Sequence, residues 1–252
     1  MMKKYFILTL ICLIFFGCDS ESVSDCFQSS GDIIQEEITL ESFTKITVFQ
    51  NVKLILKDGD EQKVILETGE NLRNDISLEV SDDRLIVTND NSCNFVRDYE
   101  LTIVYVTSPN ISEIRSSTGY PIESDGVLNY DSLSLLSESF GDEEADTTDG
   151  EFDLELNSTS VSVVANGVSY YQLSGEVENL SINFAADDSR IEAETLIAKN
   201  VTVTHRGSND MLVYPVESLT GTITGTGDVV SYNVPTTVSV GEYYKGELIY
   251  KD

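Results

Sequence analysis

The sequence predicts an all-β protein in which an N-terminal β-strand section leads into a stack of β-solenoid coils. In residues 33–105, apolar and polar residues alternate, which is typical of half-buried strands. From residue 161 onwards, similar apolar segments instead recur at intervals of 19, 21 and 18 residues. A repeat of about 20 residues with tight polar turns predicts short coils that stack and bury one continuous core.

The alternating pattern divides residues 33–115, the predicted N-terminal section, into short strands. Val52, Leu54 and Leu56 fall on one side of one strand and lysines fall on the other, as expected for a sheet with one solvated side. The same pattern places Tyr105 on the apolar side of the last strand. Polar turn residues separate the strands at residues 58–60, 68–69, 81–83 and 89–91.

Residues 116–252 are predicted to form the coils and a C-terminal cap. A first coil lies near Leu133, and an acidic insert at residues 141–151 follows it. Alternation within residues 238–250 predicts a terminal hairpin that covers the far end of the stack. The equivalent segments of the later coils begin at Val161, Leu180, Val201 and Leu219.

The chain is strongly acidic, and this excludes several classes of partner. Its 252 residues include 44 Asp and Glu but only 15 Lys and Arg, for a net charge of −29. Nucleic-acid binding rests on Lys and Arg that neutralise phosphates, so we expect no nucleic-acid partner. The single histidine, His205, excludes a metal site built from several histidines, and we expect it in an exposed turn between two strands.

Residues 1–17 have the pattern of a secretory signal peptide. Lys3 and Lys4 precede an apolar run over residues 5–16, which is shorter than the roughly 20 residues needed to span a bilayer. Gly17 followed by Cys18 resembles the lipobox of bacterial lipoproteins. This resemblance implies cleavage after Gly17 and lipid attachment to the Cys18 thiol; the alternative is an ordinary signal peptide.

The polar residues 18–32 are predicted to form a flexible tether between the lipid and the folded part. The predicted location is the cell envelope, lipid-anchored in the outer membrane. Acidic residues just after Cys18 also resemble the surface-export signal of Bacteroidetes lipoproteins. Cys26 and Cys93 remain after Cys18 is assigned to the lipid, and the oxidising envelope favours a disulfide between them. The alternative is two free thiols.

The acidic insert offers candidate ligands for calcium, the cation best suited to a chain rich in carboxylates. Its spacing does not match an EF-hand, because Thr147 occupies the place of the invariant glycine. The alternative is a solvated acidic loop. The candidate calcium ligands are Asp142, Glu144, Asp146 and Asp149.

Four tyrosines form a candidate ligand surface, because a tyrosine ring combines an apolar face with a polar tip. Rings stacked between coils inside the core would give the same pattern. In each adjacent pair, at residues 170–171 and 243–244, one ring is expected to point inward and the other outward. The candidate surface consists of Tyr170, Tyr171, Tyr214 and Tyr232. In addition, Ser132 and Thr147 each follow an aspartate, which resembles the Bacteroidetes O-glycosylation sequon.

Several short motifs, taken in order, resemble the family of auto-transporter adhesin head GIN domains common in Bacteroidetes lipoproteins. The resemblance covers about residues 33–235 and implies a right-handed parallel β-helix-like stack. It carries no catalytic residues, and the family's biochemical role is not established. The matching elements are residues 43–48, 52–57, 69–72, 85–87, 109–111 and 117–119, followed by glycine- and aspartate-rich coils such as residues 225–228.

Three functions remain open from the sequence. The first is a lipid-anchored adhesin or binding module that presents its β-solenoid surface to glycans or to protein partners, without catalysis and without a cofactor other than calcium. The second is a structural or assembly component of the envelope, including an oligomer. The third is a carbohydrate-active β-helix enzyme, which the scarcity of Lys and Arg in the coils disfavours for acidic sugars.

Overall fold

The computed structural model describes residues 28–49, 51–91, 102–141, 145 and 147–251. All strands of these residues belong to one hydrogen-bonded network, so the predicted all-β class is confirmed. The described residues hold no helix that is both long enough and apolar enough to cross a membrane.

The N-terminal section contains short strands and one 3-10 helix, as the alternating pattern predicts. Their bounds are β1 Ile33–Ile38, β2 Lys45–Val48, β3 Lys53–Asp58, β4 Lys63–Gly69, η2 Glu70–Asp75, β5 Ile76–Ser81, β6 Arg84–Asn89, β7 Ile103–Ser108 and β8 Glu113–Ser116.

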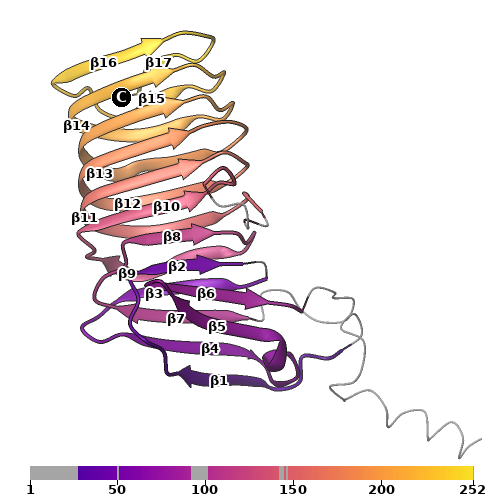
Figure 1. Ribbon diagram of the computed structural model, residues 1–252. Coiled ribbons are helices and arrows are strands. Elements are labelled where there is room, and N and C mark those ends of the chain that lie inside the picture. Colours follow the sequence, from indigo (N-terminus) through magenta and orange to yellow (C-terminus); the bar gives the residue numbers. More distant parts are fainter. Residues whose placement is uncertain (1–27, 50, 92–101, 142–144, 146, 252) are drawn as a thin grey trace, which may run out of the picture.

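Four of the following strands, β11 to β14, are long, because each runs through two sides of a coil without a break. Their bounds are β9 Pro121–Leu128, β10 Ser132–Ser137, β11 Glu151–Ala165, β12 Tyr170–Phe184, β13 Arg190–His205, β14 Met211–Ile223, β15 Val229–Ser231, β16 Thr237–Glu242 and β17 Leu248–Tyr250. The stack extends from β1 at one end to β16 and β17 at the other (Figure 1).

The network forms two sheets that share the long strands. The first sheet runs β5-β6-β2-β8-β10, then through the second halves of β11 to β14, and ends at β16. The second sheet runs β1-β4-β7-β3-β9, then through the first halves of β11 to β14, and ends at β15 and β17. Antiparallel pairs occur only in the N-terminal section, among the strands described.

The register of the first sheet confirms the predicted repeat. Val161 pairs with Leu180, Leu180 pairs with Val201, and Val201 pairs with Leu219. All four side chains are buried, so each coil places an apolar residue directly above that of the preceding coil. The core is therefore one continuous column between the two sheets, as expected when single coils cannot bury their own apolar side.

Close stacking requires glycine where a coil approaches its neighbour's backbone. Gly175 in β12 has a φ of +106°, in the region that favours glycine. A Cβ atom at this position would lie 2.1 Å from the carbonyl oxygen of Leu156 in the preceding coil. A larger residue here would separate the strands or break their hydrogen bonds.

An aromatic column inside the coils corrects two expectations. The Tyr171 ring stacks on Phe152 at a centroid distance of 4.8 Å and lies 6.1 Å from the ring of Phe184. His205 meets Phe184 edge to face at 6.0 Å. Tyr171 and His205 are both fully buried, so Tyr171 is not part of a ligand surface and His205 is not in an exposed turn. β13 extends through His205, which places this ring in register with Phe184.

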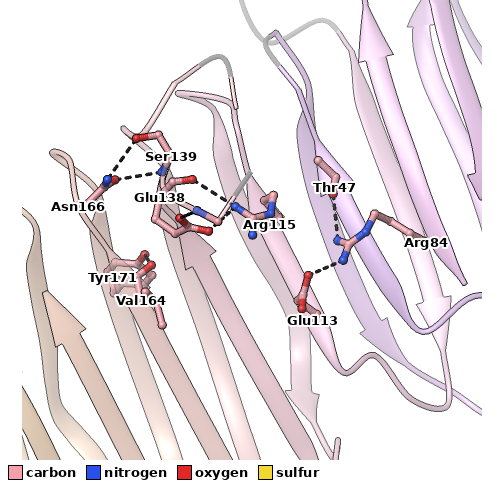
Figure 2. A network of polar contacts seen from close by, with 10 residues as sticks. Thr47, Arg84, Glu113, Arg115, Glu138, Ser139, Val164, Asn166 and Tyr171 are labelled. Carbon is pink, nitrogen blue, oxygen red and sulfur yellow. Dashed lines mark hydrogen bonds and ion pairs between the residues drawn. The ribbon is translucent and has the colours of Figure 1, made fainter. Parts of the chain in front are cut away.

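A polar network joins the N-terminal section to the coils (Figure 2). Arg115 at the end of β8 forms a 2.6 Å ion pair with Glu138 just after β10, and both side chains are more than 90% buried. The other carboxylate oxygen of Glu138 accepts a 2.6 Å hydrogen bond from the Gly141 backbone N–H. On the N-terminal side of this pair, Arg84 of β6 forms an ion pair with Glu113 of β8 and donates a hydrogen bond to the hydroxyl of Thr47 in β2.

The predicted terminal hairpin is wrong. β16 pairs in parallel with β14, and β17 pairs in parallel with β15, so each strand extends a different sheet. The pair at residues 243–244 lies in the turn between these strands, and Tyr243 and Tyr244 are both exposed rather than one in and one out. Residues 170–171, which lie within a strand, do follow the expected alternation.

Several predicted sites lie outside the described residues. These are the signal peptide and the lipidation site, both cysteines of the predicted disulfide, and three of the four candidate calcium ligands. The residues concerned are Cys18, Cys26, Cys93, Asp142, Glu144 and Asp146.

Candidate functional site

Three hollows follow one another along the outer side of the second sheet. The first, which we call the tyrosine groove, has a volume of about 220 Å³ and is lined by Gln35, Ile55, Lys57, Ile65, Tyr105, Val106, Thr107 and Asp125. The second, the acidic groove, has a volume of about 200 Å³ and is lined by Asp153, Gln172, Leu173, Ser174, Glu192, Glu194 and Thr195. The third has a volume of about 360 Å³ and lies around Val127, Glu155, Leu156, Asn157, Gly175 and Glu176.

The floor of the tyrosine groove is one rung across three neighbouring strands. Tyr105 in β7 lies directly opposite Ile55 in β3 and opposite Ile65 in β4. All three are half-buried, while their neighbours Val104 and Val106 point into the core. An aromatic ring between two branched aliphatic side chains gives a continuous apolar patch on an otherwise charged sheet.

Paired charges border this apolar rung on both sides. Lys53 forms a 2.7 Å ion pair with Glu123, and Lys57 forms a 2.6 Å ion pair with Asp125. Across the groove, the Gln35 amide donates a hydrogen bond to the Glu67 carboxylate. Each pair retains further donors or acceptors at the rim, because lysine carries three N–H groups and a carboxylate about four acceptor sites.

The Tyr105 hydroxyl keeps its proton at neutral pH. Burial raises the pKa of Tyr105, and the nearby Glu67 carboxylate raises it further, while Lys53 acts in the opposite direction. A protonated phenol both donates and accepts hydrogen bonds, so the ring offers a polar tip beside its apolar face. The groove can therefore hold a ligand with one apolar face and several hydroxyl or amide groups.

The acidic groove contains an organised carboxylate. The Tyr170 hydroxyl donates a 2.6 Å hydrogen bond to Glu192, and Arg190 donates a 2.9 Å hydrogen bond to the same carboxylate. The hydrogen bond from Tyr170 and the Arg190 charge hold the pKa of Glu192 below its ordinary value. Burial, followed by this bond to Glu192, raises the pKa of Tyr170 to about 12.

These groups suit binding better than glycoside hydrolysis. A catalytic acid of a glycosidase needs a carboxyl group with a raised pKa, whereas the pKa of Glu192 is lowered. One carboxylate oxygen of Glu194 is buried without a hydrogen-bond partner in the described residues. Within that same part of the chain, no group of three or more Asp, Glu, His or Cys is arranged to hold a metal ion.

The structure separates the four candidate tyrosines. Tyr170 lies at the acidic groove and is half-buried against Glu192. Tyr214 and Tyr232 are half-exposed at the C-terminal end of the second sheet. They lie on neighbouring coils, as the hydrogen bond from the Tyr232 N–H to the Val213 carbonyl shows. The Lys251 ammonium lies 5.4 Å from the centre of the Tyr232 ring. The predicted surface is therefore two separate places, and Tyr171 belongs to neither.

Residues of the acidic insert and the glycosylation sequons are placed in part. The Ser132 side chain is exposed at the start of β10, where a modifying enzyme has access. The Thr147 N–H donates to the Ser117 hydroxyl, and the Thr147 hydroxyl contacts the exposed carboxylate of Asp149. Glycosylation at Ser132 and Thr147 stays a prediction.

Tyr105 is the site residue that sequence reasoning assigned to the wrong side of its strand. Ile103, Val104, Tyr105 and Val106 are all apolar, so a period of two cannot decide which pair points inward. The structure buries Val104 and Val106 and turns Tyr105 outward. The flanking polar residues were the available signal: Lys53 and Lys57 face the same side of the sheet as Tyr105.

Solved structures share this fold. A putative adhesin from Bacteroides fragilis is 19% identical, with a TM-score of 0.76 over 88% of this chain and 99% of that one. A putative adhesin from Parabacteroides merdae is 16% identical, with a TM-score of 0.55 over 88% and 97% of the two chains. A putative lipid binding protein from Parabacteroides distasonis is 15% identical, with a TM-score of 0.59 over 88% and 98%.

The family match agrees with the fold. No curated protein is significantly similar to this chain. The family described as "Putative auto-transporter adhesin, head GIN domain" matches residues 42–235, which include the tyrosine groove from β3 onwards and the coils up to β15. The chain therefore belongs to the head GIN domain family of putative auto-transporter adhesins.

Proposed function

We propose that the protein is a lipid-anchored binding module of the cell envelope that recognises a glycan or a partner protein through its tyrosine groove. The proposal rests on the row of side chains in which Tyr105 lies between Ile55 and Ile65. The Lys53–Glu123 and Lys57–Asp125 ion pairs border this row. The family is described as putative adhesins, and two solved structures with the same fold are putative adhesins, which supports a binding role at the cell surface.

A sugar unit is the ligand that best fits this combination. Sugars have an apolar face of C–H groups that stacks on aromatic rings, and hydroxyl groups that bond to charged pairs. The volume of about 220 Å³ lies below the range of roughly 300–1,000 Å³ of pockets for drug-sized ligands, which favours one sugar unit or one protruding side chain. We propose binding without catalysis, in keeping with a family described as putative adhesins.

The location proposed here rests on the sequence. Lipid attached to Cys18 would hold the protein in the outer membrane, with residues 18–32 as the tether and the groove outside the bilayer. A disulfide between Cys26 and Cys93 would fasten the tether to the N-terminal section, and calcium at the acidic insert would order that insert. We further propose that the coils wind as a right-handed parallel β-helix, a rigid support for the binding surface.

A glycan array probed with residues 19–252, which lack the signal peptide and the predicted lipidation site Cys18, tests the ligand. We expect binding to a defined set of glycans, weakened about tenfold or more by Tyr105→Ala and largely retained by Tyr105→Phe, which keeps the stacking ring. Tyr120→Ala removes a half-buried tyrosine outside the groove and is the matched control.

Thermal melting of each variant separates lost binding from lost folding. Binding that survives Tyr105→Ala in a folded protein would assign the ligand to another surface. If no glycan binds, the glycan proposal fails. A partner protein that the parent chain captures from envelope extracts, and that Tyr105→Ala does not, would then support the alternative that the tyrosine groove binds a protein.

A further inference from the structure

The coil at the C-terminal end leaves part of the core column uncovered. Val238 lies in register with the buried Leu219, and Tyr250 lies in register with the buried Ser231. Both therefore hold inward positions, yet Val238 is 43% exposed and Tyr250 is 42% exposed, because no coil among the described residues lies above them. Tyr243 adds a strongly exposed ring beside this surface.

Both sheets also end here in strands with a free edge. β16 is paired only with β14 and β17 only with β15, among the strands that the structure describes. A strand edge presents backbone N–H and C=O groups that can pair with another chain. Edge pairing and the uncovered side chains occur on the same end, so one partner could satisfy both.

Charge favours contact at this end. The protein carries a net charge of −29, and this repels a second copy from most of its surface. Residues 229–252, in contrast, hold three acidic and two basic side chains, a net charge of only −1: Glu242, Lys245, Glu247, Lys251 and Asp252. The terminal coil is therefore a place where two copies can meet without strong repulsion.

We propose that two copies of the protein form an end-to-end dimer through their terminal coils. A two-fold axis perpendicular to the sheets would place each β16 antiparallel to the partner's β16 and each β17 antiparallel to the partner's β17. One such rotation continues both sheets at once and brings Val238 and Tyr250 of the two copies over the same core. An isologous contact of this kind closes after two subunits.

Features at both ends disfavour an open head-to-tail chain. Glu242 lies at an inward position in register with Ile223, where its carboxylate accepts a 2.9 Å hydrogen bond from the Leu248 N–H. At the opposite end of the stack, the edge strand β1 carries Glu36 and Glu37, which form ion pairs with Arg73 and Lys63. Charged side chains on an edge strand discourage pairing with another chain, so the terminal coil finds a better partner in its own copy than in β1.

The arrangement of the dimer has a consequence that rests on the proposed lipid anchor. β1 lies at the far end of the stack from β16 and β17 (Figure 1), so an end-to-end dimer has its two β1 strands at opposite ends. Lipids on Cys18 of both copies would then favour insertion into two different membranes. If the chain forms a dimer in solution but the lipidated chain does not bridge vesicles, the proposed lipid anchor is contradicted and the proposed dimer is not.

Sedimentation equilibrium of residues 19–252 at physiological salt tests the dimer. We expect a reversible monomer–dimer equilibrium that strengthens as salt screens the acidic copies. Val238→Asp should weaken the dimer about tenfold or more, because it places a charge in the apolar contact. Val168→Asp is the matched control: Val168 is 60% exposed in a turn of the coils, away from the end, and this change should leave the dimer unchanged.

Engineered cysteines test the position of the contact. Ser239→Cys, in the middle of β16, should produce a dimer that is covalent without reductant, beyond the level of the parent chain. Ser181→Cys makes the same change on the first sheet at an exposed position in β12, and it should not. A monomer at the highest soluble concentration, oligomers that keep growing with concentration, or equal cross-linking at both positions would each overturn the proposal.

Discussion

The two ends of the stack are built in opposite ways. At the N-terminal end, η2 links the two sheets and is fastened to the residues before β1, because the Asn71 N–H donates to the Ser30 carbonyl and the Glu70 N–H donates to the Asp32 carbonyl. Leu72, within η2, is only 3% exposed. At the C-terminal end, parallel strands simply stop, and Val238 remains 43% exposed.

The difference follows from strand direction. The first sheet ends at the antiparallel strand β5 and the second at the antiparallel strand β1, and η2 connects β4 of the second sheet to β5 of the first at this end. Ion pairs of Glu36 with Arg73 and of Glu37 with Lys63 add charge to the β1 edge, which discourages pairing with other chains. A parallel stack has no such reversal, so its last coil stays open unless another chain covers it.

The largest effect is expected where the two regions join. Glu138→Ala should lower the free energy of unfolding by about 3–5 kcal/mol, because it leaves the Arg115 charge buried without its carboxylate. Denaturant unfolding measures the change. The double variant Arg115→Met with Glu138→Leu should recover most of the loss, since an apolar pair of similar volume can replace a buried ion pair. A loss below about 1 kcal/mol would mean that water reaches the pair.

A second prediction compares the closed and the open end directly. Leu72→Ala should cost about 2–4 kcal/mol, because it opens a cavity under η2. Leu248→Ala should cost about 1 kcal/mol, because Leu248 is only partly buried at the open end. Both values come from denaturant unfolding at a protein concentration that keeps the chain monomeric. Equal losses would contradict the idea that only one end is sealed.

A third prediction concerns acid and the coils. Burial lowers the pKa of His205 below its ordinary 6.5, and the Asn209 backbone and the Asp210 and Asp228 carboxylates offset this only in part. The unfolded chain therefore takes up a proton first, and stability contributed by neutral His205 is lost as the pH falls from about 6.5 towards the folded-state pKa. The slope is at most about 1.4 kcal/mol per pH unit.

His205→Phe removes this titration and keeps an aromatic ring next to Phe184. The difference in stability between pH 7.5 and 5.5, measured by urea unfolding, should be smaller in His205→Phe than in the parent chain, whatever the absolute stability of the variant. Identical pH dependence would mean that carboxylates alone govern the response to acid.

The smallest effect is expected at the β1 edge. Glu36→Gln with Glu37→Gln removes two exposed ion pairs and should change the free energy of unfolding by less than about 1 kcal/mol. The same variant should self-associate more readily in light scattering, because a neutral edge strand resembles the open C-terminal end. A large loss of stability would show that the charges support the fold of the edge itself.

The sequence determined the class of fold and the repeat. Apolar residues at Val161, Leu180, Val201 and Leu219 recur at the spacing of one coil, and the structure pairs each with the next. This was predictable because each coil must place an apolar residue above the last. Turn residues likewise marked where most strands end, although the assignment of His205 to a turn was wrong by one residue.

Only the tertiary structure decided which side of a strand faces out and how the stack ends. Tyr105 lies in a run of apolar residues, so its outward position depends on β3 and β4 packing beside it, not on any local pattern. The strands at Val238 and Tyr250 alternate like a hairpin, yet each joins a different sheet, because β16 pairs with β14 and β17 pairs with β15. Local periodicity determines the length of each coil, whereas pairing between distant strands determines which side chains face outward and which strands end the stack.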